Sequence, residues 1–246
     1  MSSSFTIKPE QVFGEENSQH YFKQGGDKKM KSEAIAIFLD VDGTLIDSAG
    51  QLFDDCRRAA EKLGLKIPSD EDFSAVWASP WPQFVNALWP DFDFDAFNEQ
   101  FEEGPAEALS GAREIVSWLR ERQFFLALIS NRARASLSSR MEQVEMPLEL
   151  FDYVQAVDDY EFIKPDPRVF NHALSLLSGK GISASKAIFV GDALSDCEAA
   201  MGAGIIFIAV LTGVTTREQF IAAGLAEEFI LNSVKDIPEF LQKLLA

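Results

Sequence analysis

Two aspartates at the end of an apolar run are the residues of this sequence best spaced for chemistry. Residues 35–47 read Ile-Ala-Ile-Phe-Leu-Asp-Val-Asp-Gly-Thr-Leu-Ile-Asp. At the end of a strand, Asp40 and Asp42 leave on the same side, because alternate residues share a face. Carboxylates this close stay ionised near neutral pH only with a cation between them, and Mg²⁺ favours such oxygen ligands. An acidic surface turn is the alternative, and the flanking residues favour a magnesium-type site.

Two further groups of polar residues also follow apolar runs. Residues 124–129 are apolar and lead to Ser130 and Asn131, and residues 187–190 lead through Gly191 to Asp192 and Asp196. A hydroxyl and an amide at a helix start can hold phosphoryl oxygens, although the same pair also serves as an ordinary N-cap. Asp192 and Asp196 would lie one helical turn apart. All of these side chains are therefore candidates for one site.

A lysine beside two prolines completes the set. Lys164 opens the segment Lys-Pro-Asp-Pro, residues 164–167. The prolines fix the entry to the helix predicted after them and place Lys164 just outside it. A solvated lysine would also fit this position. Its place after a predicted strand favours a functional role.

The four segments together resemble the motifs of the haloacid dehalogenase-like hydrolases, a phosphatase superfamily with an aspartate nucleophile. The resemblance runs from about Ile35 to the C-terminus and is strongest to the phosphoglycolate phosphatase-like subgroup. It implies a Mg²⁺-dependent phosphatase that hydrolyses a small phosphomonoester through an aspartyl-phosphate. The residues that it assigns are Asp40 as nucleophile and Asp42 as acid and base; Asp40, the Asp42 backbone carbonyl and Asp192 around the metal, with Asp196 in or behind this shell; Ser130 and Lys164 in catalysis; and Gly43, Thr44, Ser130, Asn131 and Lys164 around the phosphate.

Two other functions stay open at this point. The same chemistry with a different acceptor would make a sugar-phosphate mutase, and a phosphatase fold without activity would be a metal- or partner-binding module. Within the resembled superfamily, the enzymes that break carbon–halogen bonds lack an aspartate equivalent to Asp42. Its presence therefore favours phosphoryl transfer.

The order of predicted elements indicates an α/β fold, with a Rossmann-like parallel-sheet core and an inserted all-helical cap domain. Strands are predicted near 35–39, 124–130, 153–157, 187–191, 205–210 and 229–231, with helices between them. Residues 51–63, 71–78, 82–89 and 94–103 are predicted to be helical and contain no strand-like alternation. The expected division is a tail over 1–33, a core over 34–48 and 109–246, and a cap over 49–108.

Composition limits the partners. The chain has 246 residues and a formal net charge of −17, which would repel nucleic acids and anionic membranes. It has no apolar run long enough for a membrane span and no signal-peptide pattern at its start, so we expect a cytoplasmic protein. Its two cysteines are expected to be reduced thiols. The expected partner is a small phosphorylated metabolite, and the sequence identifies neither that metabolite nor an oligomeric state.

Overall fold

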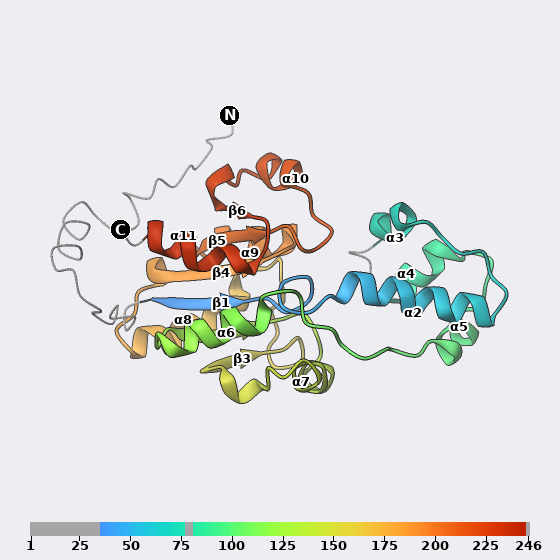
Figure 1. Ribbon diagram of the computed structural model, residues 1–246, viewed down its shortest axis with the longest axis horizontal. Coiled ribbons are helices and arrows are strands. Elements are labelled where there is room, and N and C mark those ends of the chain that lie inside the picture. The colour runs from blue at the N-terminus through green and yellow to red at the C-terminus, as the bar shows by residue number, and fades with distance from the viewer. Residues whose placement is uncertain (1–34, 77–80, 245–246) are drawn as a thin grey trace.

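A six-stranded parallel sheet forms the centre of the protein (Figure 1). The computed structural model describes residues 35–76 and 81–244, so the expected tail over 1–33 lies outside the described residues. The strands lie in the order β3-β2-β1-β4-β5-β6, and every neighbouring pair is parallel. Their bounds are β1 Ala36–Leu39, β2 Phe125–Ile129, β3 Tyr153–Gln155, β4 Ala187–Gly191, β5 Ile206–Val210 and β6 Ile230–Leu231.

The apolar runs of the sequence are the strands of this sheet. Every residue of β1, β2, β4 and β5 is buried, which requires cover on both faces of the sheet. Branched and aromatic side chains fill these strands, and they suit a pleated buried surface. The parallel α/β core expected from the sequence is therefore confirmed.

The winding of the sheet reverses between β1 and β4. The chain passes from β1 outward to β2 and β3, then crosses back to β4 and continues to β5 and β6 on the other side. In open α/β sheets, sites form outside the carboxyl ends of the strands at such a reversal. The ends of β1 and β4 are therefore where a site is expected.

Helices connect the strands and cover the sheet. The α-helices of the core are α6 Ala112–Glu121, α7 Arg134–Gln143, α8 Asn171–Gly179, α9 Leu194–Gly202, α10 Arg217–Ala222 and α11 Ile237–Leu244. Short 3-10 helices are η2 Leu148–Leu150, η3 Pro167–Phe170, η4 Ala184–Lys186, η5 Glu227–Phe229 and η6 Val234–Asp236. No helix in the described ranges is long and apolar enough to cross a membrane.

Four of the described helices between β1 and β2 lie to one side of the sheet, beyond the end of β1 (Figure 1). They are α2 Ser48–Lys62, α3 Asp70–Val76, α4 Trp81–Leu88 and α5 Phe94–Gln100. These helices bury their own apolar cluster, separate from the cluster around the sheet. The separate cluster supports the proposed division into a core and a cap.

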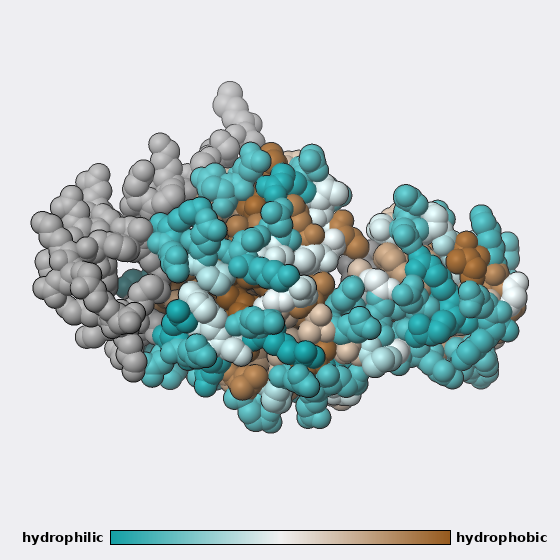
Figure 2. Space-filling model, viewed as in Figure 1, coloured by the Kyte–Doolittle hydropathy of each residue, from teal (hydrophilic) through white to brown (hydrophobic). Residues whose placement is uncertain are grey.

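Aromatic side chains build most of the cap cluster. Phe73, Phe84 and Phe97 are buried, and Trp89 stacks on Phe97 with ring centroids 4.6 Å apart. Trp89 also donates its indole N–H to the Lys66 carbonyl at 2.9 Å. The surface seen in Figure 2 is mostly hydrophilic over both the core and the cap. The aromatic residues of the cap therefore act chiefly as its core.

Candidate active site

Three polar residues follow directly on three neighbouring strands. Asp40 follows β1, Ser130 follows β2 and Asp192 follows β4. Parallel strands end at the same edge of the sheet, so these side chains converge there even though they are far apart in sequence. All three are buried. The site thus lies at the reversal of the winding.

Lys164 reaches the same place from the chain that follows β3. Its Nζ donates to Asp40 Oδ1 at 2.6 Å and forms an ion pair with Asp196 Oδ1 at 2.6 Å. Burial works against the charge of Lys164, but Asp196 and Asp40 outweigh it and raise the pKa of the lysine. A buried ammonium therefore lies between two carboxylates.

The acidic group is larger than this lysine can neutralise. Asp40, Asp192 and Asp196 each offer a carboxylate oxygen within 4.8 Å of the others. Burial, only partly offset by Lys164, raises the pKa of Asp40 to about 7. Burial and then the neighbouring carboxylate Asp40 raise the pKa of Asp192 well above its usual value. The three carboxylates are therefore only partly neutralised by the single ammonium of Lys164.

A hard divalent cation fits the site on these grounds. Asp192 Oδ1 is buried and has no hydrogen-bond partner among the described residues. Oxygen ligands of this kind are those that Mg²⁺ prefers. A cation would also offset the burial and the carboxylate repulsion that raise the pKa values of Asp40 and Asp192. Both the donor set and the unpartnered oxygen are thus suited to Mg²⁺.

Two glycines make room for Asp192. Gly43 has a φ of +75°, and a Cβ there would lie 2.3 Å from Asp192 Oδ2. A Cβ on Gly213 would lie 1.7 Å from the same oxygen. Thr212 Oγ1 donates to the Gly43 carbonyl at 2.6 Å, which joins the two loops. Neither position can carry a side chain without displacing the carboxylate.

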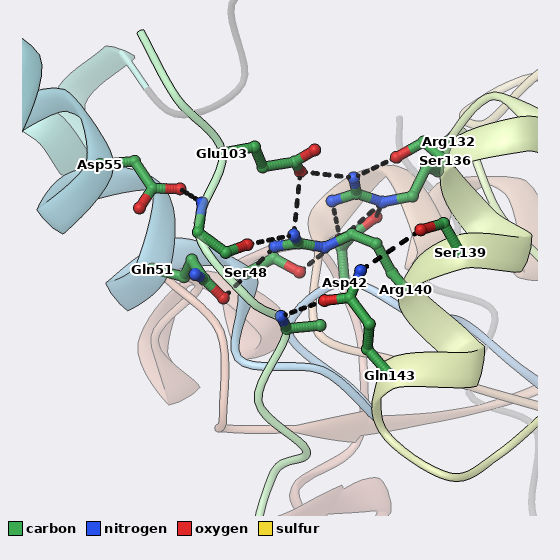
Figure 3. Close-up of polar contacts among 12 residues, drawn as sticks. Asp42, Ser48, Gln51, Asp55, Glu103, Arg132, Ser136, Ser139, Arg140 and Gln143 are labelled. Carbon is green, nitrogen blue, oxygen red and sulfur yellow. Dashed lines mark hydrogen bonds and ion pairs between the residues drawn. The ribbon is translucent and has the colours of Figure 1, made fainter.

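The side chain of Asp42 does not belong to this group of three carboxylates and is held by the guanidinium of Arg132 (Figure 3). Arg132 Nη2 lies 2.5 Å from Asp42 Oδ1, and Arg132 Nε donates to Asp42 Oδ2 at 3.1 Å. The Ser48 hydroxyl donates to the same carboxylate. Burial alone would raise the pKa of Asp42, but Arg132 outweighs it and the pKa lies below its usual value. The structure thus holds Asp42 as a carboxylate.

The other expected phosphate contacts lie around these charges. Ser130 Oγ accepts a hydrogen bond from the Arg132 backbone at 3.1 Å, which leaves its own proton to donate. Thr44 Oγ1 is buried with no hydrogen-bond partner within the described part of the chain. The Asn131 side chain instead forms two hydrogen bonds with the Lys164 backbone. Its Oδ1 accepts from the Lys164 N–H at 3.1 Å, and its Nδ2 donates to the Lys164 carbonyl at 3.0 Å. The Asn131 side chain therefore positions the lysine, and the phosphate contact expected of this residue would come from its backbone amide.

Several partners of these residues did not follow from the sequence. Arg132 carries no spacing signal toward Asp42, because the two residues are 90 positions apart, and Ser48, only six positions from Asp42, belongs to none of the four segments that indicated the site. The only indication of the Arg132 contact was that this arginine directly follows the candidate site residues Ser130 and Asn131. Asp196 was expected in or behind the metal shell, and its ion pair with Lys164 shows that it also holds the lysine.

Comparisons with known proteins agree with this geometry. The family model described as haloacid dehalogenase-like hydrolase matches residues 37–210. A phosphoglycolate phosphatase of Pseudomonas fluorescens is 27% identical over 193 residues, which cover 72% of this chain and 69% of that protein. A second one, from Nitrosospira multiformis, is 28% identical over 69% of this chain and 79% of its own length.

Solved structures share the fold. A haloacid dehalogenase-like family hydrolase of Streptococcus pneumoniae superposes with a TM-score of 0.66 at 17% identity, covering 86% of this chain and 100% of that one. CbbY of Rhodobacter sphaeroides, solved with phosphate, gives a TM-score of 0.63 at 21% identity over 82% of this chain and 95% of its own. The matched family model spans the strand ends that carry Asp40, Ser130 and Asp192. The chain therefore belongs to the haloacid dehalogenase-like hydrolase family.

Proposed function

We propose that the protein is a Mg²⁺-dependent phosphatase that hydrolyses a small phosphomonoester through an aspartyl-phosphate. The observation that carries this proposal is Asp40, a buried carboxylate at the end of the central strand, paired with Lys164 at 2.6 Å. The relatives named phosphoglycolate phosphatase support a small phosphorylated substrate. A cytoplasmic location stays a prediction from the sequence.

Asp40 is the nucleophile in this proposal. One of its carboxylate oxygens attacks phosphorus in line, so that a bond from Asp40 to phosphorus forms as the ester P–O bond breaks. Lys164 stays beside the attacking carboxylate and offsets negative charge on the transferring group. The Ser130 hydroxyl and the backbone amide of Asn131 donate to the phosphoryl oxygens. The product of this first step is the free alcohol and a phosphorylated Asp40.

Asp42 moves the protons. It takes up a proton from solvent as it leaves Arg132 and gives this proton to the leaving oxygen as the ester bond breaks. It later takes a proton from the water that attacks the phosphorylated Asp40. The second step releases inorganic phosphate and restores the carboxylate of Asp40. Asp42 has to turn away from Arg132 to reach the leaving oxygen, because the guanidinium occupies both of its oxygens.

Asp40, Asp192 and the backbone carbonyl of Asp42 would hold the metal ion, with Asp196 behind them. When bound, Mg²⁺ supplies positive charge that stabilises the transferring phosphoryl group. The raised pKa values of Asp40 and Asp192 support this assignment, since both carboxyls lack a sufficient counter-charge in the protein alone.

Phosphate release from a panel of small phosphate esters tests the proposal. The panel is run with Mg²⁺ or EDTA, with the native protein, with Asp40→Asn and with Asp91→Asn as a control on the exposed surface of the cap. We expect Mg²⁺-dependent release from the native protein and the control, and none from Asp40→Asn. The proposal is wrong if the native protein with Mg²⁺ releases phosphate from no ester.

A further inference from the structure

Two arginines of the core converge on one carboxylate of the chain that returns from the cap (Figure 3). Arg132 Nη1 and Arg140 Nη1 each lie 3.2 Å from Glu103 Oε1. Glu103 follows α5, between the last cap helix and the core, whereas Arg140 belongs to α7. The carboxylate therefore joins the returning linker to the part of the core that borders the site.

One of these arginines serves two carboxylates at once. Arg132 binds Asp42 through Nε and Nη2 and binds Glu103 through Nη1. Its side chain is 18% exposed, so it would be costly to leave without a counter-charge. Asp42 and Glu103 thus share a largely buried guanidinium.

The position of Glu103 does not depend on Arg132 alone. Arg140 donates to the Gly104 carbonyl at 2.9 Å, and Asp55 on α2 accepts from the Gly104 backbone N–H at 2.9 Å. A Cβ on Gly104 would lie 2.6 Å from the side chain of Gln51, so the linker is closely packed here. These contacts fix Glu103 next to Arg132 from both α2 and α7.

We propose that Glu103 is a positioning residue that retains Arg132 when Asp42 turns from the arginine toward the leaving oxygen. The inference rests on the proposed phosphatase function, in which Asp42 must leave this ion pair. With Glu103 in place, Arg132 loses its ion pair with Asp42 but keeps the one with Glu103. Without Glu103, release of Asp42 leaves the guanidinium unpaired, and the acid is slower to reach the substrate.

Leaving groups of different strength separate this role from a structural one. An alkyl phosphate needs a proton on its leaving oxygen, whereas 4-nitrophenyl phosphate releases a stable phenolate without one. The test compares native protein and Glu103→Gln in single-turnover release of the alcohol or phenol. We expect the rate of alcohol release from the alkyl ester to fall about tenfold at saturating enzyme, with little change in the enzyme concentration that gives half of the maximal rate. Release of nitrophenolate should stay within about twofold of the native rate.

Glu102→Gln is the matched control. Glu102 lies on the same linker, its side chain is 81% exposed, and it pairs with Lys62 at 3.2 Å, away from Arg132. We expect native rates with both esters. A second comparison places Glu103→Gln in an Arg132→Gln background, where the substitution at 103 should have no further effect, because no guanidinium is left to retain.

The outcomes separate this inference from the function on which it rests. Equal loss with both esters, no loss with either, or an undiminished effect of Glu103→Gln in the Arg132→Gln background would each overturn the exchange of partners while leaving the phosphatase assignment intact. Failure of the native protein with Mg²⁺ to release phosphate from any ester of the panel would overturn both proposals together.

Discussion

Replacing Asp40, the proposed nucleophile, should stabilise the metal-free protein while abolishing its activity. Asp40 is 5% exposed and lies in a group of three carboxylates with one lysine. Ionisation of its carboxyl in this place is opposed, as its raised pKa shows. In Asp40→Asn the side chain keeps its shape and loses the charge, and Lys164 keeps its second partner, Asp196, at 2.6 Å. The substitution therefore removes a charge that burial and the neighbouring carboxylates disfavour, without leaving the lysine unpaired.

The pKa of Asp40 gives the magnitude. It rises from 3.8 to about 7 on folding, so the native state binds more protons between these values and stability falls as the pH rises through this window. At about 1.4 kcal/mol for each pKa unit, the penalty is on the order of 4 kcal/mol at pH 8 and on the order of 2 kcal/mol at pH 5. Asp40→Asn should recover this amount, or roughly 8–16 °C in Tm at pH 8.

Unfolding in urea and by heat, in EDTA, measures this effect at pH 5 and pH 8. Asp91→Asn serves as the control, since an exposed carboxyl should show no such trend. Saturating Mg²⁺ should stabilise the native protein more than Asp40→Asn and narrow the difference between them. The reasoning fails if Asp40→Asn is less stable than the native protein at pH 8, or if the difference between the two does not grow from pH 5 to pH 8.

Three further predictions follow from single contacts. Gly213→Ala should displace Asp192 and abolish stabilisation by Mg²⁺ in a thermal-shift titration, whereas Gly179→Ala, whose Cβ would meet nothing within 4 Å, should retain it; equal responses would contradict the crowding argument. Lys164→Met should lower kcat by about a hundredfold or more with Mg²⁺ present, since it removes the cation beside the nucleophile, and near-native kcat would exclude that role. Phe97→Ala should cost about 3–5 kcal/mol of unfolding free energy in urea, because this ring is fully buried in the cap cluster, and a loss below about 1 kcal/mol would be incompatible with that burial.

The elements of the core were predictable because each carries a local signal. The runs that became β1, β2, β4 and β5 are continuously apolar, as strands buried on both faces must be. The helices between β1 and β2 were predictable from their periodicity and from the prolines between them. The ends of the strands then placed Asp40, Ser130 and Asp192 at one edge of a parallel sheet.

The tertiary structure decided the contacts among these residues. The order of the strands puts β1 between β2 and β4, and no local pattern encodes that order. The structure brings the expected site residues together at one edge of the sheet, but their partners did not follow from the sequence: the Asn131 side chain, for example, forms hydrogen bonds with the backbone of Lys164.

The other contacts that the sequence did not reveal are ion pairs between residues far apart in the chain. Arg132 and Asp42 are 90 positions apart, and the linker that carries Glu103 reaches Arg132 only because the cap helices return it to the core. The sequence by itself determined which side chains end the strands, since burial and periodicity act within a few residues. Only the fold determined which of those charges face one another, because ion pairs depend on the positions of separate elements in space.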